Sequence, residues 1–187
     1  MRDSMTETRT EGLHPQLTWE GSAKNKLFRI ARPDQPGVLQ LKDKNTRGAR
    51  YTHLRQNIDF LIENYLQSIS PGDSSVFIQF WELLAADAFA ELQLLDDSWE
   101  VPEIACERIA DVLIKKQGDY GTANIARFGR TGLIIRLHDK VARLENLRGS
   151  GGARNESIED TLLDIIGYSV VGLMWEDGTF MVPLQPS

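Results

Sequence analysis

Apolar residues recur every three or four positions over most of the chain from Tyr51 onward, the spacing that places them on one face of an α-helix. In the first such stretch, Leu54, Ile58 and Leu61 share a face. Short runs rich in glycine, proline and serine separate the stretches and end the helices. One helix is predicted from Tyr51 to the break at Ser70–Asp73. Further helices are predicted at residues 75–95, 102–117, 131–147 and 157–175. This series favours an all-α fold, an antiparallel bundle of about five helices.

The first 50 residues lack this periodicity. Residues 1–15 are polar and predict disorder, since few of their side chains would compensate the entropy of ordering. Prolines and a glycine interrupt the next stretch, where we expect short extended pieces at Lys26–Ile30 and Val38–Leu41, then a charged linker at 43–50. The predicted organisation is an irregular, partly disordered segment at 1–50, a helical bundle domain at 51–178 and a tail at 179–187.

Size and charge narrow the classes of function. A chain of 187 residues fits one domain. Its net charge of −6 argues against broad nucleic-acid binding, which needs many phosphate-neutralising cations. No apolar run reaches the length of about 18 residues that a membrane span needs, and the N-terminus has no hydrophobic signal region. We therefore expect a cytoplasmic protein with no membrane partner. The single cysteine, Cys106, lies in an apolar helical pattern and is expected in the core.

Two carboxylates lie where carboxylates are costly. Asp87 and Glu91 are four residues apart on the predicted helix 75–95, in the same sector as Phe80 and Leu84. Unpaired burial would be unfavourable, so they need a metal ion, a cationic partner or a water-filled cleft. The alternative is that this face borders solvent or that each acid meets an arginine of the core.

A second acidic stripe runs along the last predicted helix. Glu156, Asp160 and Asp164 recur every four residues, and Tyr168 continues the stripe. A solvated acidic face is the usual explanation, but the same sector continues into residues too apolar for solvent: Gly167, Val171 and Met174. A covered cleft with a divalent cation fits better, because Mg²⁺ prefers carboxylate oxygens, and Mn²⁺ would serve in its place. The predicted metal ligands are Asp87, Glu91, Asp160 and Asp164.

Basic residues on the predicted helix 131–147 supply the opposite charge. Arg136, Lys140 and Arg143 border its apolar stripe and are candidates for holding phosphates. The alternative is salt bridging to the acidic stripe. The polar and aromatic turn before this helix contains Asp119, Tyr120 and, further on, Phe128, and an aromatic ring there would stack on a base. The predicted substrate-binding residues are Asp119, Tyr120, Asn124, Arg136, Lys140, Arg143 and Tyr168.

The segments Lys116–Gly121, Gly132–Leu144 and Asn155–Tyr168 resemble the nucleotide modification associated domain family, which is common in bacteriophages. The resemblance covers residues 116–175. It implies a phage or prophage origin and a role in nucleotide metabolism or DNA-base modification.

A more distant similarity is to the all-α nucleoside triphosphate pyrophosphohydrolases of the MazG-like group, which bind Mg²⁺ through acidic pairs on a four-helix bundle. It implies that Asp87 with Glu91, and Asp160 with Asp164, are the corresponding pairs. Both have four-residue spacing instead of three-residue spacing. Either spacing keeps two carboxylates on one helical face.

The leading hypothesis is a Mg²⁺-dependent pyrophosphohydrolase of nucleoside or deoxynucleoside triphosphates, in which Glu156 orients or deprotonates the attacking water. One alternative is a nucleotide-binding or sequestering module without catalysis. Another is a phage adaptor that binds a protein through Leu17–Arg50. Related enzymes form dimers or tetramers and the helix 75–95 is very apolar, so a homo-oligomer is expected.

Overall fold

The protein, seen in a computed structural model, is described over residues 18–32, 47–66, 74–150 and 157–184. Its α-helices are α1 (Trp19–Ile30), α2 (Arg47–Leu61), α3 (Ser74–Leu95), α4 (Pro102–Tyr120), α5 (Ala123–Ala126), α6 (Gly129–Ser150) and α7 (Ile158–Glu176). Shorter turns are η2 (Ile62–Leu66), η3 (Asp97–Trp99) and η4 (Thr179–Met181). No strand occurs in these ranges, so the all-α prediction is confirmed. The five predicted helices correspond to α2, α3, α4, α6 and α7.

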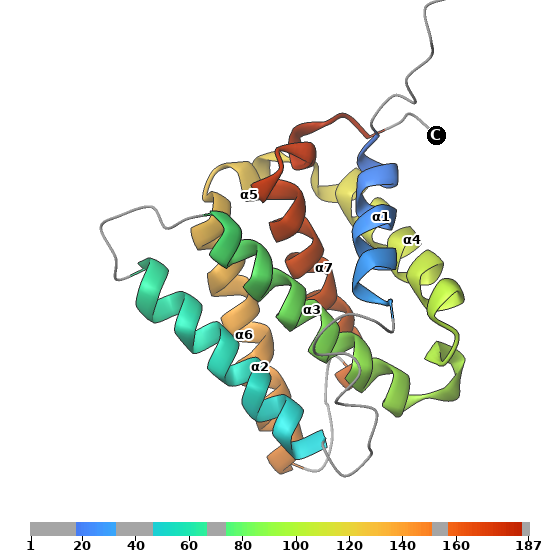
Figure 1. Ribbon diagram of the computed structural model, residues 1–187, viewed down its shortest axis with the longest axis vertical. Helices are drawn as coiled ribbons and strands as arrows, with labels where there is room; N and C mark the ends of the chain where they lie inside the picture. The colour runs from blue at the N-terminus through green and yellow to red at the C-terminus, as the bar shows by residue number, and fades with distance from the viewer. Residues whose placement is uncertain (1–17, 33–46, 67–73, 151–156, 185–187) are drawn as a thin grey trace, which may run out of the picture.

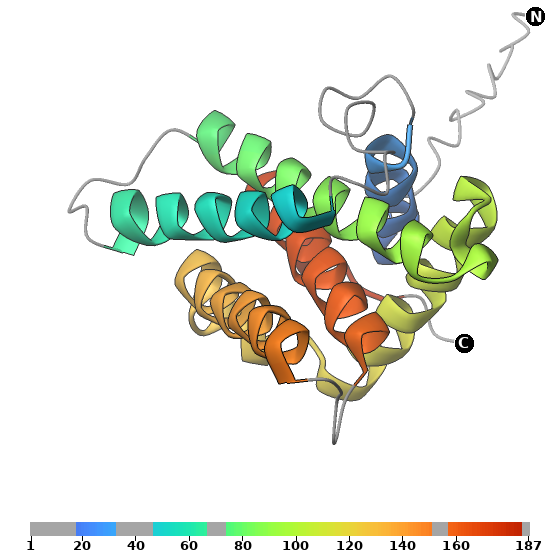
Figure 2. The ribbon, with the colours of Figure 1, turned by 90° about the horizontal axis from the view of Figure 1, so that it is seen from below.

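Four helices form the central bundle (Figures 1 and 2). α3 packs along α7, α7 along α6, α6 against α2, and α2 against α3, which closes a ring of four. α4 packs on α1, and this pair lies beside α7. α7 therefore packs against two other helices of the ring, α3 and α6, and against the flanking pair. This explains why its apolar residues extend around most of its circumference.

The structure corrects the sequence-based view of the N-terminal part. Lys26–Ile30 was expected to be extended but forms the second half of the helix α1. Thr18 caps this helix by accepting a hydrogen bond from the Gly21 backbone N–H at 3.0 Å. The buried face of α1 consists of Trp19, Ser22, Ala23, Leu27 and Ile30. These positions follow the helical spacing, and the lysines and arginine between them diluted the apolar signal. The other expected extended piece, Val38–Leu41, lies outside the described residues.

The remaining helix boundaries fall close to the predicted ones. α4 continues to Tyr120, three residues past the expected end, and stops at Gly121, whose φ of 63° suits glycine. α7 begins at a capping box in which Ser157 and Asp160 exchange hydrogen bonds. Cys106 is fully buried, as predicted.

α3 is covered within one chain. Its buried residues include Phe77, Trp81, Leu84 and Phe89, which pack into the shared core. The apolar character of this helix is therefore accounted for by intramolecular packing and gives no separate support for a subunit interface. The predicted homo-oligomer stays a prediction. Every helix in the described ranges is too short or too polar to serve as a membrane span.

Candidate functional site

A cavity of about 620 Å³ opens between the end of α4, α5, α6 and the middle of α7. This volume lies in the range of small-molecule sites, about 300–1,000 Å³. Its lining residues are Trp19, Leu113, Lys116, Gln117, Tyr120, Gly121, Asn124, Ile125, Arg136, Lys140, Asp164, Gly167, Tyr168, Val171 and Phe180. The lining contains both charged and apolar side chains, so the cavity suits a ligand with an anionic part and a ring.

Five of the seven residues predicted to bind substrate line this cavity: Tyr120, Asn124, Arg136, Lys140 and Tyr168. Helical spacing brings them together, because Arg136 and Lys140 are one turn apart on α6 and Asp164 and Tyr168 are one turn apart on α7. Asp119 does not line the cavity and lies exposed in the last turn of α4. Arg143, one turn beyond Lys140, also lies outside the lining.

Asp164 is the acidic residue of the cavity and is held by two lysines. Lys140 Nζ lies 2.6 Å from its Oδ2, and Lys116 forms a second ion pair with its Oδ1. Burial favours the neutral carboxyl, but the hydrogen bonds from Lys116 and Lys140 outweigh it and lower the pKa of Asp164. The carboxylate therefore stays charged at neutral pH. Lys116 was not predicted as a site residue, although its position one turn before Tyr120 on α4 was a usable signal.

Arg136 is positioned by an aromatic ring. Its guanidinium carbon lies 5.8 Å from the centre of the Tyr168 ring, a cation–π distance. Within the described ranges Arg136 forms no ion pair with a carboxylate. Its charge is thus directed to the cavity without being neutralised by a protein acid.

Asp87 and Glu91 are almost completely buried and face α2, so the alternative of a face bordering solvent does not hold for them. Arg50, itself fully buried, forms an ion pair with Glu91. The Nδ1 atom of His53 lies 2.7 Å from Oδ2 of Asp87. Both acids therefore have cationic or hydrogen-bonding partners, one of the alternatives that the sequence left open. Neither residue lines the cavity.

The four predicted metal ligands are not gathered in one place. Asp160 is exposed and serves the capping box of α7, Asp164 is in the cavity, and Asp87 and Glu91 face α2. In the described part of the chain no three His, Cys, Asp or Glu side chains lie close enough to share a metal ion. Glu156, predicted to act on water, lies outside the described residues. A shared four-carboxylate metal centre is therefore not assembled, and the metal itself stays a prediction.

The burial of Asp87 gives a testable pH dependence. Burial raises the pKa of its carboxyl from 3.8 to about 6, partly offset by His53 and Arg50. The folded chain thus binds this proton more tightly than the unfolded chain, so the stabilisation from protonation is present below about pH 4 and is lost as pH rises through 6. Asp87→Asn mimics the neutral form. We expect its free energy of unfolding, measured in urea at pH 7, to exceed that of wild type by about 3 kcal/mol.

The comparison across pH isolates this group from the other carboxylates. Wild type and Asp87→Asn should have nearly equal unfolding free energies at pH 4, and the gap should open between pH 4 and 6. A gap that is constant over this range would show that Asp87 keeps an ordinary pKa in the folded chain.

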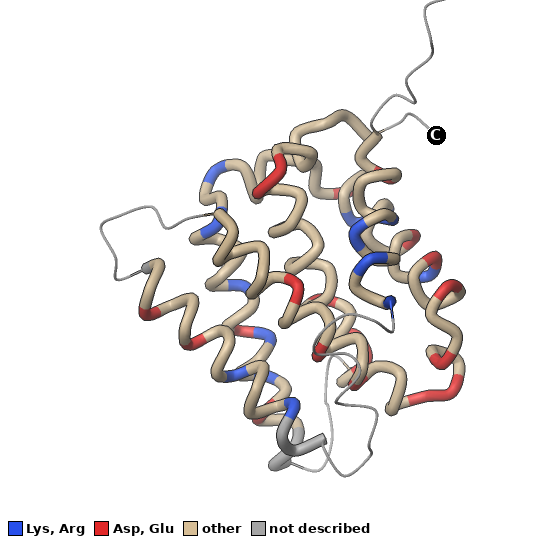
Figure 3. The backbone as a smooth tube through the Cα atoms, viewed as in Figure 1, with Lys and Arg blue, Asp and Glu red and all other residues tan. Residues whose placement is uncertain are grey.

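Charge is distributed unevenly over the protein. Figure 3 shows acidic residues gathered where η3 leads into α4 and on the outer side of α4. Basic residues recur along α6, among them the cavity residues Arg136 and Lys140. The α6 side therefore favours the approach of an anion, whereas the outer side of α4 disfavours it.

Residues 116–175 match the family described as nucleotide modification associated domain 1, which confirms the resemblance seen in the sequence. The matched segment runs from Lys116, in the cavity, to the penultimate residue of α7, and contains most of the cavity lining. No curated protein and no solved structure matches the chain. The similarity to MazG-like pyrophosphohydrolases is not shown by these comparisons.

Proposed function

We propose that the cavity binds a nucleotide, with its phosphate held by Lys116, Arg136 and Lys140. The observation that carries this proposal is that three cations and one carboxylate converge on one cavity, so positive charge is in excess. Arginine offers a fork of donors to phosphate oxygens, and lysine acts as a point charge. The match of residues 116–175 to a nucleotide-associated domain agrees with this assignment.

Asp164 occupies the two lysines that a bound phosphate would contact. Asp164 pairs with both Lys116 and Lys140 and so limits the cost of placing two cations beside each other. A phosphate group carries more negative charge than a single carboxylate and accepts more hydrogen bonds. It would therefore compete with Asp164 for the two lysines. Binding is expected to weaken as salt is added, because the attraction is electrostatic.

Arg136 provides the direct test. Replacing it by glutamine removes one charged donor to phosphate while keeping an unbranched polar side chain. We expect about tenfold weaker binding of nucleotides, the effect of losing one charge-assisted hydrogen bond. Isothermal titration calorimetry with deoxynucleoside mono-, di- and triphosphates, each with and without Mg²⁺, measures the affinity. Chromatography of the ligand afterwards shows whether it stays intact.

The matched control is Arg127→Gln. Arg127 also lies 5.8 Å from the centre of an aromatic ring, that of Phe128, but it is exposed and does not line the cavity. Its replacement should leave nucleotide affinity unchanged. If the wild-type protein shows no heat of binding and no thermal shift with any nucleotide at millimolar concentration, the proposal is wrong.

Hydrolysis of the bound nucleotide is a second candidate function, favoured by one observation. Asp164 is a charged oxygen donor inside the cavity, and a phosphate that takes over its lysines would free it. Mg²⁺ commonly binds through one or two carboxylates together with substrate phosphates. Bound there, the ion would polarise a phosphoryl oxygen and lower the pKa of a coordinated water. Asp87 and Glu91 do not fit such an ion, since Arg50 and His53 already hold them.

The same assays separate the two candidates. Pyrophosphate or phosphate release that requires Mg²⁺ and disappears in Asp164→Asn would establish hydrolysis. An intact nucleotide after long incubation with Mg²⁺ would leave a binding module.

A further inference from the structure

Part of the apolar lining of the cavity comes from elements outside residues 116–175. Trp19 comes from α1 and Phe180 from η4, and both are almost fully buried in the cavity wall. Leu113, Ile125 and Val171 complete this apolar lining. Because residues 116–175 contain neither Trp19 nor Phe180, the matched segment alone does not set the shape of the apolar lining.

Two polar atoms of the cavity wall lack partners. The indole Nε1 of Trp19 is a buried donor, and Oδ1 of Asn124 is a buried acceptor, and neither has a hydrogen-bond partner among the described residues. Such atoms are unfavourable when left unsatisfied. Both belong to side chains that line the same cavity. One is a donor and the other an acceptor, so they complement a ligand group that carries both an acceptor and a donor.

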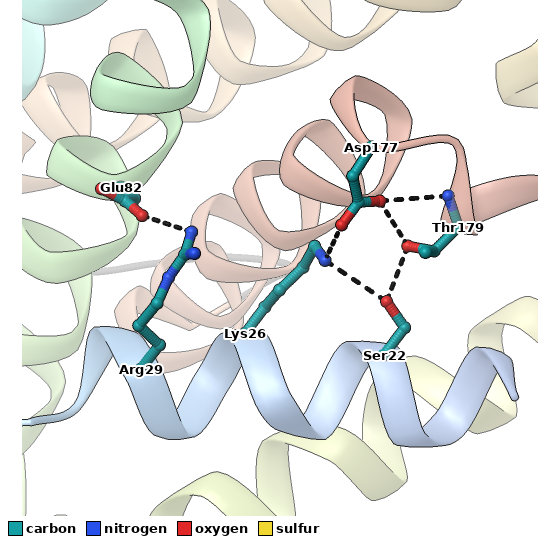
Figure 4. Close-up of polar contacts among 6 residues, drawn as sticks. All are labelled: Ser22, Lys26, Arg29, Glu82, Asp177 and Thr179. Atoms are coloured by element: carbon teal, nitrogen blue, oxygen red, sulfur yellow. Dashed lines mark hydrogen bonds and ion pairs between the residues drawn. The ribbon is translucent and has the colours of Figure 1, made fainter. Parts of the chain in front are cut away.

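α1 is held against the C-terminal turn by a polar network (Figure 4). Ser22 Oγ and Thr179 Oγ1 are 2.6 Å apart, and Lys26 Nζ donates to Asp177 Oδ2 at 2.5 Å. Asp177 Oδ1 in turn accepts from the backbone N–H and the hydroxyl of Thr179. This network fixes α1 one turn beyond Trp19, so the indole ring is placed in the wall together with Phe180.

We propose that Trp19 and Asn124 recognise the base of the bound nucleotide, a heteroaromatic ring that presents both an acceptor and a donor. This inference rests on the proposed nucleotide site and adds the residues that select the ring. The apolar wall excludes water from the ring, while the two polar atoms favour a base over a plain aromatic group. Both atoms are shielded from solvent, so the proposed contact with the base requires neighbouring wall side chains to shift.

Trp19→Phe removes the donor and keeps an apolar ring. We expect about tenfold weaker binding of whichever deoxynucleoside monophosphate binds wild type most tightly. Binding of ribose 5-phosphate, which has no base, should not change. Asn124→Ala should show the same split between the two ligands. A base beside the indole should also change the intrinsic tryptophan fluorescence, and this signal should be lost in Trp19→Phe.

Trp99→Phe is the matched control. Trp99 is buried and its Nε1 also lacks a partner among the described residues, but it does not line the cavity. Its replacement should leave both affinities and the fluorescence response unchanged. Circular dichroism confirms that each variant is folded.

The outcomes distinguish this inference from the site on which it rests. If Trp19→Phe and Asn124→Ala bind nucleotide as wild type does, base recognition by these residues is excluded while the phosphate site stands. If the variants bind nucleotide and ribose 5-phosphate equally more weakly, Trp19 and Asn124 act only on the shape of the site. That outcome also excludes base recognition. If wild type binds neither ligand, both proposals fail.

Discussion

Arg50→Met is expected to lower the free energy of unfolding by about 3–5 kcal/mol, because it leaves the Glu91 carboxylate charged and buried without its main partner. Arg50 is fully buried, and Glu91 is 1% exposed. The Arg50 guanidinium also favours the ionised form of Asp87, so the pKa of Asp87 should rise further in this variant. Urea unfolding followed by circular dichroism measures the change.

The double variant Arg50→Met/Glu91→Leu serves as the comparison. Removing both charges replaces an ion pair by apolar side chains of similar volume, which is often neutral or stabilising. We therefore expect it to recover most of the stability lost in Arg50→Met. A double variant as unstable as the single one would mean that Arg50 acts mainly through contacts other than Glu91.

Gly172→Ala is expected to destabilise the protein by about 2–3 kcal/mol through overpacking. A Cβ atom at this position would lie 2.6 Å from Cδ2 and 2.8 Å from Cε2 of Trp81. The indole has no room to move, because it is fully buried and its Nε1 donates to Glu176 at 3.3 Å. α3 and α7 would have to separate where they pack most closely. A lower midpoint of thermal or urea unfolding reports the loss.

Gly118→Ala provides the opposite expectation with the same chemical change. Gly118 is exposed within α4, and an added Cβ would meet only Leu184 Cδ2 at 3.8 Å, an ordinary contact. Alanine has a higher helix propensity than glycine, by about 1 kcal/mol. This variant should therefore be slightly more stable than wild type. If both substitutions stabilise the chain, the explanation that an added Cβ at Gly172 clashes with Trp81 is excluded.

Much of the candidate site was predictable because it depends on helical spacing within short segments. Arg136 and Lys140, or Asp164 and Tyr168, share a face whatever the rest of the chain does. Tyr120 and Asn124 lie in the short stretch just before α6, so the sequence already placed them near its cations. The burial of Asp87 and Glu91 followed from the apolar residues around them on the same helical face. Asp119 and Arg143 do not line the cavity: Asp119 is rotated by about 100° from its neighbour Tyr120 on α4, and Arg143 lies one turn further along α6 than Lys140.

The partners of these residues depend on the packing between helices. The pattern indicated that Asp87 and Glu91 need a cation or a metal ion, but it did not point to Arg50 and His53, which precede them by 34 to 41 residues. The same limit applies to Asp160, whose carboxylate caps α7 instead of joining Asp164.

By itself the sequence determined the all-α class, the approximate positions of five helices, the placing of two acids on an apolar helical face and the match of residues 116–175 to a nucleotide-associated family, because each depends on local periodicity or local motif. Only the tertiary structure decided that α1 is a helix within the core and that Asp164 pairs with Lys116 and Lys140. It also decided that Trp19 and Phe180 close the cavity. Those contacts join segments far apart in the chain, and their identity is set by which helix faces meet once the bundle has packed.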